Sequence, residues 1–300
     1  MKTRSMKRFF VLLLLTLCAF LTLAKTVTTE FEPGSGSFTF TDQRGDPQKP
    51  IRVWYFKPPQ SSDSSPVLFV MHGMQRNAQE YRDQWIYYAR QYGALLVVPE
   101  FSEKNYPGEG YAQGNMFDSS LRPIPENRSG FALVEHLFDY VRTQDNNQSI
   151  DYYLYGHSAG GQFVHRMLLF KPDAHIRRAV AANPGFYTLP RFLEEFPYGL
   201  EKTGLPGGTI QLAFGKDLTL LLGERDTLEN QKSLNKSVGA MKQGNQRFAR
   251  GMNFFKIAQQ ESLTRGISFE WKLQTVPGAG HSNSQMAGAA ARILFESNRK

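Results

Sequence analysis

Short apolar runs recur along the chain, and most of them end in turn-forming residues. Runs of this length are typical of strands that are buried on both faces of a sheet. The pattern predicts five such strands, at Val67–Met71, Ala94–Val98, Tyr152–Tyr155, Ile176–Ala182 and Leu218–Leu222. Two stretches of alternating character nearer the N-terminus, Phe38–Phe40 and Ile51–Phe56, predict antiparallel strands.

Helical periodicity fills the intervals between the apolar runs and follows the last of them. Apolar side chains recur at helical spacing in four stretches: Asn77–Tyr92, Ser129–Arg142, Gly160–Phe170 and Ser282–Phe295. Ser129 is suited to cap the second of these helices at its N-terminus. Alternation of strands and helices indicates an α/β fold, with a mostly parallel central sheet and helices on both of its faces.

Two long segments interrupt this alternation, at residues 102–128 and 188–214. Both follow predicted strands, so both are expected at the carboxyl edge of the sheet, where open α/β folds bind ligands. Long connections in a compact domain are usually lids or binding walls. Tyr106, Tyr111 and Phe117 in the first segment are expected either to line a pocket or to pack the segment onto the domain.

The N-terminus has the layout of a secretory signal peptide. Basic residues at positions 2, 4, 7 and 8 precede the apolar run Phe9–Leu23, and Ala24 provides a small residue at the predicted cleavage point. The alternative is an uncleaved membrane anchor. The run is shorter than the roughly 20 residues that span a bilayer, which favours cleavage. We therefore expect residues 1–24 to be a signal peptide and residues 25–300 to form a single domain.

Net charge is +8, from 35 Lys and Arg against 27 Asp and Glu. The signal segment holds four basic residues and no acidic one, so its removal would halve this charge. Much of the remainder lies in Lys232–Lys256, which has six basic residues and no acidic one. Binding of nucleic acid is one interpretation. A solvated basic helix face, with Phe254 among the buried residues opposite, is the simpler one, and we expect no nucleic-acid partner.

Composition narrows the class of protein further. A hydrophobic fraction of 41% supports a packed core and excludes disorder for most of the chain. Cys18 is the single cysteine and lies in the signal segment. This excludes an intrachain disulfide framework and a multi-cysteine zinc site. We expect neither a metal nor a cofactor.

The candidate chemistry is concentrated in the sequence Gly156-His157-Ser158-Ala159-Gly160. This G-x-S-x-G pattern follows one predicted strand and opens the next predicted helix, which is the setting of a nucleophile elbow. Glycines are required at positions 156 and 160 because strand and helix pass close together there. The alternative is a glycine-rich turn that carries an ordinary serine.

On these residues the chain resembles the α/β-hydrolase superfamily, from the first antiparallel strands to the last helix. The sequence GHSAGG is similar to the carboxylesterase-like branch that includes poly(3-hydroxybutyrate) depolymerases and feruloyl esterases. The resemblance implies Ser158 as the nucleophile, an acid after a later strand, and a histidine near the C-terminus.

The acid is expected at Asp226, just past the carboxyl end of the strand Leu218–Leu222. Asp217 lies at the opposite end of that strand. Glu224 is the nearest rival, but Asp226 occupies the position of the acid in a G-x-x-D turn that resembles the family's acid loop. The alternative role of Asp226 is to cap the turn.

The base is expected at His281, one of six histidines. It follows the predicted strand Phe269–Val276 across a flexible loop and precedes the last helix, where the family carries its histidine. The alternative is a loop or capping histidine. The other five are less suited. His136 is expected at a surface or in packing, His165 is carried away from Ser158 by the rise of its helix, and His175 precedes a strand at its amino end, while His72 and His157 have other interpretations.

An oxyanion hole needs two preorganised N–H donors. The resemblance implies the backbone N–H of Ala159, which follows the nucleophile, and that of Met74 in the sequence His72-Gly73-Met74-Gln75. Gly73 lets the backbone approach the substrate, and His72 is expected to be structural. The Gln75 side chain is a further candidate for a polar contact.

These residues together predict a serine carboxylic-ester hydrolase that works through an acyl-enzyme. Its substrate is expected to be a small or polymeric ester, and its location secreted or periplasmic, without stable membrane insertion after cleavage. Two alternatives stay open: a serine peptidase of the prolyl-oligopeptidase type, and an inactive hydrolase-fold protein that binds a ligand.

Overall fold

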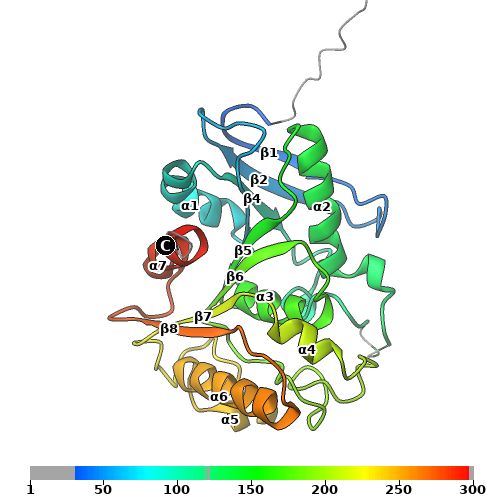
Figure 1. Cartoon of the computed structure of the whole chain (residues 1–300), viewed down its shortest axis with the longest axis vertical. Coiled ribbons are helices and arrows are strands. Elements are labelled where there is room, and N and C mark those ends of the chain that lie inside the picture. The colour runs from blue at the N-terminus through cyan, green and yellow to red at the C-terminus, as the bar shows by residue number, and fades with distance from the viewer. Residues whose placement is uncertain (1–30, 119, 121, 297–300) are drawn as a thin grey trace, which may run out of the picture.

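The computed structural model of the chain describes residues 31–118, 120 and 122–296 (Figure 1). The predicted signal peptide at residues 1–24 lies outside this range and stays a prediction.

A central sheet of eight strands organises the described residues, in the order β1-β2-β4-β3-β5-β6-β7-β8. β2 runs antiparallel to both β1 and β4, whereas β3 to β8 are parallel to one another. The mostly parallel sheet and the antiparallel pair before it are therefore confirmed. The strands are β1 (Gly34–Phe40), β2 (Ile51–Lys57), β3 (Val67–Met71), β4 (Leu95–Glu100), β5 (Tyr152–His157), β6 (Ile176–Ala182), β7 (Leu218–Gly223) and β8 (Lys272–Val276).

Helices cover both faces of this sheet (Figure 1). α1 and α7 pack on one face, and α2, α3, α4 and α6 pack on the other. The helices are α1 (Ala78–Tyr92), α2 (Gly130–Gln144), α3 (Ala159–Phe170), α4 (Thr209–Phe214), α5 (Val238–Gln243), α6 (Arg247–Arg265) and α7 (Asn283–Glu296). The predicted cap of α2 is confirmed, because the Ser129 hydroxyl accepts a hydrogen bond from Ala132 N–H at 3.0 Å.

The apolar runs of the central strands are continuous because each strand feeds two cores. In β3, Phe69 and Met71 belong to the core beneath α2 and α3, whereas Leu68 and Val70 belong to the core beneath α1 and α7. Successive side chains of a strand point to opposite faces, so a strand that is covered on both sides is apolar at most of its positions.

Residues 102–128 pack onto the domain through their aromatic side chains. Tyr106 and Tyr111 are buried, and the Tyr111 hydroxyl donates to the carbonyl of His72 at 2.8 Å. Packing, rather than a pocket wall, is thus the role of these two rings. Phe117 contacts Phe196 of the second long segment, with ring centroids 4.8 Å apart.

The second long segment is not irregular throughout. Its last six residues form α4, which the sequence analysis took as loop. A helix of six residues makes fewer than two turns, which is too short for its periodicity to be recognised.

Arg166 in α3 ties both long segments to the sheet. Its buried guanidinium donates to the carbonyl of Ala112 in the first segment and to the hydroxyl of Thr188 in the second, both at 2.8 Å. One helix therefore orients both segments relative to β5.

The interpretation of the basic segment as a solvated helix face is partly wrong. Phe254 is buried as predicted, but Arg247 and Arg250 are buried as well. Arg250 donates to the carbonyls of Gly185 and Gly244 at 2.8 and 2.9 Å, so its charge serves to satisfy backbone groups. The lysines of the segment are exposed, at positions 232, 236, 242 and 256.

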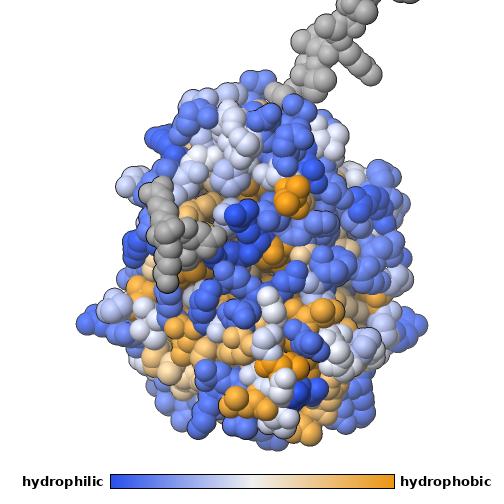
Figure 2. Space-filling view, in the orientation of Figure 1, coloured by the Kyte–Doolittle hydropathy of each residue, from blue (hydrophilic) through white to orange (hydrophobic). Residues whose placement is uncertain are grey.

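Hydrophobic surface gathers on the lower part of the face in Figure 2, over the helices of the C-terminal half. Leu212, Val238 and Leu263 are among the large apolar side chains exposed on α4, α5 and α6. By contrast, the exposed positions of the edge strand β1 are polar. Within the described residues, no helix combines the length and apolar character needed to cross a membrane.

Candidate active site

Four loops meet at the carboxyl edge of the parallel strands. Met74 follows β3, Ser158 follows β5, Asp226 follows β7, and His281 lies between β8 and α7. Each of these positions was predicted from the sequence, and the sheet order brings their loops to the same edge.

Ser158 occupies a strained turn between β5 and α3. Its φ and ψ of 58° and −114° lie where residues other than glycine are rarely found. A Cβ atom on Gly156 would lie 2.2 Å from the carbonyl oxygen of Gly160, and one on Gly160 would lie 2.0 Å from that of Met71. Only glycine fits at these two positions, as the sequence analysis expected, and the tight packing exposes Ser158 at the top of the sheet.

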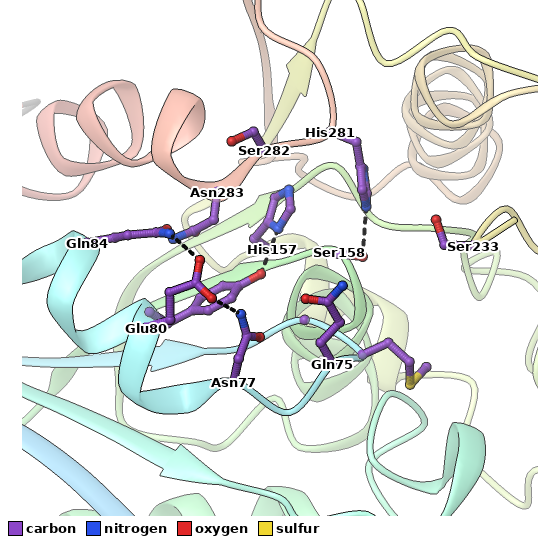
Figure 3. A pocket seen from close by; sticks show the side chains of 13 residues that line it. Gln75, Asn77, Glu80, Gln84, His157, Ser158, Ser233, His281, Ser282 and Asn283 are labelled. Carbon is purple, nitrogen blue, oxygen red and sulfur yellow. Dashed lines mark hydrogen bonds between the residues drawn. The ribbon is translucent and has the colours of Figure 1, made fainter. Parts of the chain in front are cut away.

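Ser158, His281 and Asp226 form a continuous line of hydrogen bonds. Figure 3 shows the bond between His281 and Ser158. His281 Nδ1 lies 2.7 Å from Asp226 Oδ2, and His281 Nε2 lies 2.9 Å from Ser158 Oγ. A carboxylate accepts hydrogen bonds, so Nδ1 is the donor, and Nε2 of the neutral ring is left to accept from the serine hydroxyl. Asp226 is buried and His281 is nearly so, which keeps water from competing for these bonds.

Neither rival acid reaches the histidine. Glu224 accepts a hydrogen bond from the Thr275 hydroxyl at 2.9 Å. Asp217, at the amino end of β7, pairs with Arg178 and Lys272, and these two cations contribute to lowering its carboxyl pKa against the opposing effect of burial.

Three of the remaining histidines are buried and neutral. Burial lowers the pKa of His72 to about 3 and lowers those of His157 and His165 well below the usual range. His72 Nε2 accepts from the N–H of Phe101 at 3.0 Å, which supports the structural role expected of it. His165 likewise accepts from the N–H of Thr188 at 3.0 Å.

The other two histidines pair with carboxylates away from the serine. His136 lies 2.9 Å from Asp42, and His175 lies 2.6 Å from Glu135. His281 is therefore the histidine that meets Ser158.

The two expected oxyanion donors border the same cavity as Ser158. Met74 and Ala159 both line this cavity, which has a volume of about 230 Å³. Ala159 is the first residue of α3, so its N–H has no acceptor within the helix. Among the described residues, the N–H of Met74 has no hydrogen-bond acceptor. A Cβ on Gly73 would lie 3.9 Å from Ser158 Cβ, so this loop closely approaches the serine.

A second cavity, of about 260 Å³, lies on the His281 side of Ser158 (Figure 3). We call it the histidine-side cavity and the one bordered by Ala159 the alanine-side cavity. Gln75, a candidate for a polar contact, lines the histidine-side cavity with Glu80 and Gln84. His157 also lines it, and its Nδ1 lies 2.9 Å from the Tyr81 hydroxyl. This cavity is therefore polar.

Two residues that the sequence analysis did not single out support the acid and the base. Arg247 NH1 lies 3.5 Å from Asp226 Oδ1, on the oxygen that His281 does not use. Asn183 accepts from Gly223 N–H at 2.8 Å and donates to the Gly280 carbonyl at 3.0 Å. It thus joins the loop of Asp226 to the loop of His281.

In the part of the chain that the structure describes, no three His, Cys, Asp or Glu side chains are grouped so that they could hold a metal ion.

Two solved structures are similar to this chain over nearly its whole described length. Poly(aspartic acid) hydrolase-1 from Sphingomonas sp. KT-1 is 39% identical, with a TM-score of 0.86, over 89% of this chain and 100% of that chain. The poly(3-hydroxybutyrate) depolymerase LpqC from Bordetella parapertussis is 34% identical, with a TM-score of 0.84, over 88% and 90%. This chain belongs to the α/β-hydrolase superfamily, in the branch that includes these two proteins. Membership in this branch supports the assignment of the chain as a hydrolase.

More distant structures share the fold alone. The fluorophosphonate-binding serine hydrolase FphF from Staphylococcus aureus is 14% identical, with a TM-score of 0.56, over 88% of this chain and 98% of that chain. No protein-family model matches the sequence, and no curated protein is significantly similar to it.

Proposed function

We propose that this hydrolase cleaves carboxylic esters through an acyl-enzyme on Ser158. The observation that carries the proposal is the unbroken line from Asp226 through His281 to Ser158, which ends at a serine in a strained elbow. This arrangement is what an activated serine nucleophile requires.

The steps follow from the geometry. His281 Nε2 takes the proton of Ser158 Oγ as that oxygen attacks the carbonyl carbon. The N–H groups of Met74 and Ala159 stabilise the oxyanion, and Asp226 stabilises the imidazolium. His281 then gives the proton to the leaving alcohol as the ester C–O bond breaks. Water, deprotonated by His281, releases the acid from Ser158 by the same route in reverse.

A second candidate reaction is cleavage of the amide bonds of an acidic polymer such as poly(aspartic acid). Lys232 and Arg247 line the alanine-side cavity beside Ser158. Of these two cations, Lys232 favours an acyl group that bears a carboxylate, whereas the charge of Arg247 already faces Asp226 and Glu109 in the same lining bears the opposite charge. The more similar of the two relatives, at 39% identity, is a poly(aspartic acid) hydrolase by name.

Turnover of p-nitrophenyl acetate tests the nucleophile. Ser158→Ala should abolish turnover and fluorophosphonate labelling, while Ser284→Ala, at an exposed serine of α7, should retain both. Full activity in Ser158→Ala would overturn the proposal. Parallel assays with poly(aspartic acid) and with poly(3-hydroxybutyrate) then distinguish amide cleavage from ester cleavage.

We also infer that residues 25–300 form one catalytic domain with lid-like segments at 102–128 and 188–214, of which the first contributes Glu109 to the alanine-side cavity. We infer further that the enzyme is exported after loss of residues 1–24. The export signal has the charge and apolar layout described above. N-terminal sequencing of the protein recovered outside the cytoplasm tests it: a first residue near position 25 is expected, and an intact Met1 would contradict cleavage.

A further inference from the structure

A carboxylate that the steps above do not use faces the acyl-transfer site. Glu109 lies in a short 3₁₀ turn, Gly108–Gly110, within the first long segment. It lines the alanine-side cavity together with Ser158 and Ala159. Its Oε2 atom is shielded from solvent and has no hydrogen-bond partner among the described residues. A buried carboxylate oxygen without a hydrogen bond is costly, so a ligand group that donates to this atom would be stabilised there.

Two arginines, Arg166 and Arg76, act on the charge of Glu109, but their hydrogen bonds go to other groups. Arg166 donates through NH1 to the Gln162 side chain at 3.1 Å and through Nε to Thr188, while its buried NH2 has no hydrogen-bond partner among the described residues. Arg76 donates to three backbone carbonyls and to Glu103. Neither guanidinium forms an ion pair with Glu109 within the described residues. Burial raises the pKa of the Glu109 carboxyl, and the charges of these two arginines oppose that rise.

The position of His281 tells which part of the substrate meets Glu109. His281 must pass its proton to the leaving group, so the leaving group has to lie on its side of Ser158. His281 lines the histidine-side cavity and is not part of the alanine-side lining. The alanine-side cavity, bordered by both expected oxyanion donors, is left for the acyl group.

We propose that Glu109 is a specificity-determining residue that accepts a hydrogen bond from an N–H or O–H group on the acyl portion of the substrate. The inference rests on the proposed acyl transfer at Ser158. Acyl groups with an amide N–H or a hydroxyl would satisfy the carboxylate, whereas plain alkanoyl groups would desolvate it without compensation.

Two matched esters isolate this contact. The p-nitrophenyl esters of N-acetyl-β-alanine and of its N-methyl analogue share a leaving group and differ in the donor N–H. The quantity to compare is the ratio of their kcat/KM values, in the wild type, Glu109→Gln and Glu109→Ala. Because each protein provides its own ratio, a general loss of activity cancels. Glu270→Gln, at an exposed glutamate outside both cavities, is the matched control.

The wild type should favour the N–H ester, and the preference should fall about tenfold or more in Glu109→Ala, as expected for a hydrogen bond to a charged group. Glu109→Gln keeps a carbonyl acceptor and should be intermediate, while Glu270→Gln should keep the wild-type ratio. An equal ratio in the wild type and in both Glu109 variants would overturn the inference alone. A wild type that hydrolyses p-nitrophenyl acetate but neither of these esters would also overturn the inference alone, whereas one that hydrolyses none of the three would overturn the proposed function and this inference with it.

Discussion

The guanidinium of Arg247 lies 3.5 Å from the carboxylate of Asp226, and both side chains are almost completely buried. His281 binds one carboxylate oxygen and Arg247 faces the other. Arg247 also donates to the side chains of Gln231 and Ser233. Burial lowers the pKa of Arg247, and the charge of Asp226 opposes that change. The pair therefore fixes the acid and the loop that follows it as one unit.

Replacing Arg247 should impair turnover without touching the reacting atoms. In Arg247→Met the buried carboxylate of Asp226 loses its second partner, and Gln231 and Ser233 lose a donor. We expect kcat to fall about tenfold or more through misplacement of His281, and the free energy of unfolding to fall by about 1–3 kcal/mol. Ester kinetics and guanidinium unfolding measure the two effects.

Arg247→Lys is the matched control, because it keeps the charge but not the planar fork of donors. Its kcat should lie between those of the wild type and Arg247→Met. Wild-type kcat in a folded Arg247→Met would show that Asp226 and His281 keep their positions without this arginine.

Gly160 should tolerate no side chain. Its Cβ would lie 2.0 Å from the carbonyl oxygen of Met71, a backbone atom of the central strand β3. Gly160→Ala should therefore lower the free energy of unfolding by about 3 kcal/mol or more, or prevent folding. At Gly207 a Cβ would meet nothing within 4 Å, so Gly207→Ala should change stability by less than about 1 kcal/mol. Equal melting temperatures for the two variants would contradict the packing described for the elbow.

Local signals predicted the elbow, and the resemblance to the superfamily extended the prediction to Asp226 and His281. Ser158 lies between glycines that follow an apolar strand, and Asp226 and His281 lie just beyond the carboxyl ends of two others. Each of these cues is contained within about ten residues, and a parallel sheet brings the strand ends together whatever the details of packing.

Arg247, Asn183 and Glu109 could not be predicted in this way. In the sequence, Arg247 is one of six basic residues in the segment Lys232–Lys256. Its burial accompanies a contact with Asp226, which lies 21 positions away in the chain. Asn183 acts by joining two loops that follow different strands. The role proposed for Glu109 depends on the alanine-side cavity, which the first long segment and α3 line together. Roles of this kind depend on tertiary contacts, which periodicity does not encode.

The backbone N–H of Met74 is testable by proline substitution. Met74→Pro removes the N–H, and Met74→Ala keeps it while removing most of the side chain. Loss of one oxyanion donor typically lowers kcat by about 10²–10³-fold, so the proline variant should lose far more activity than the alanine variant. Equal losses of kcat in two variants with wild-type circular dichroism would show that this N–H does not stabilise the transition state.

Buried histidines should make the fold sensitive to acid. Burial lowers the pKa of His72 from 6.5 to about 3, and those of His157 and His165 shift in the same direction. Between about pH 3 and pH 6.5, the side chain of His72 is protonated in the unfolded chain but not in the folded protein. The free energy of unfolding must therefore fall as pH falls below about 6.5, and each such histidine contributes at most about 1.4 kcal/mol per pH unit.

His72→Gln should flatten this dependence. Glutamine offers an oxygen to the N–H of Phe101, which His72 Nε2 accepts at 3.0 Å, but it cannot be protonated. Urea unfolding at several pH values between about 4.5 and 6.5 should give a slope that is shallower than the wild-type slope by up to about 1.4 kcal/mol per pH unit. The variant is expected to be less stable at neutral pH, so the slope and not the absolute value is compared. Parallel lines for the two proteins would mean that His72 takes up its proton in the folded state near its ordinary pKa, and that the interior around it admits a charge.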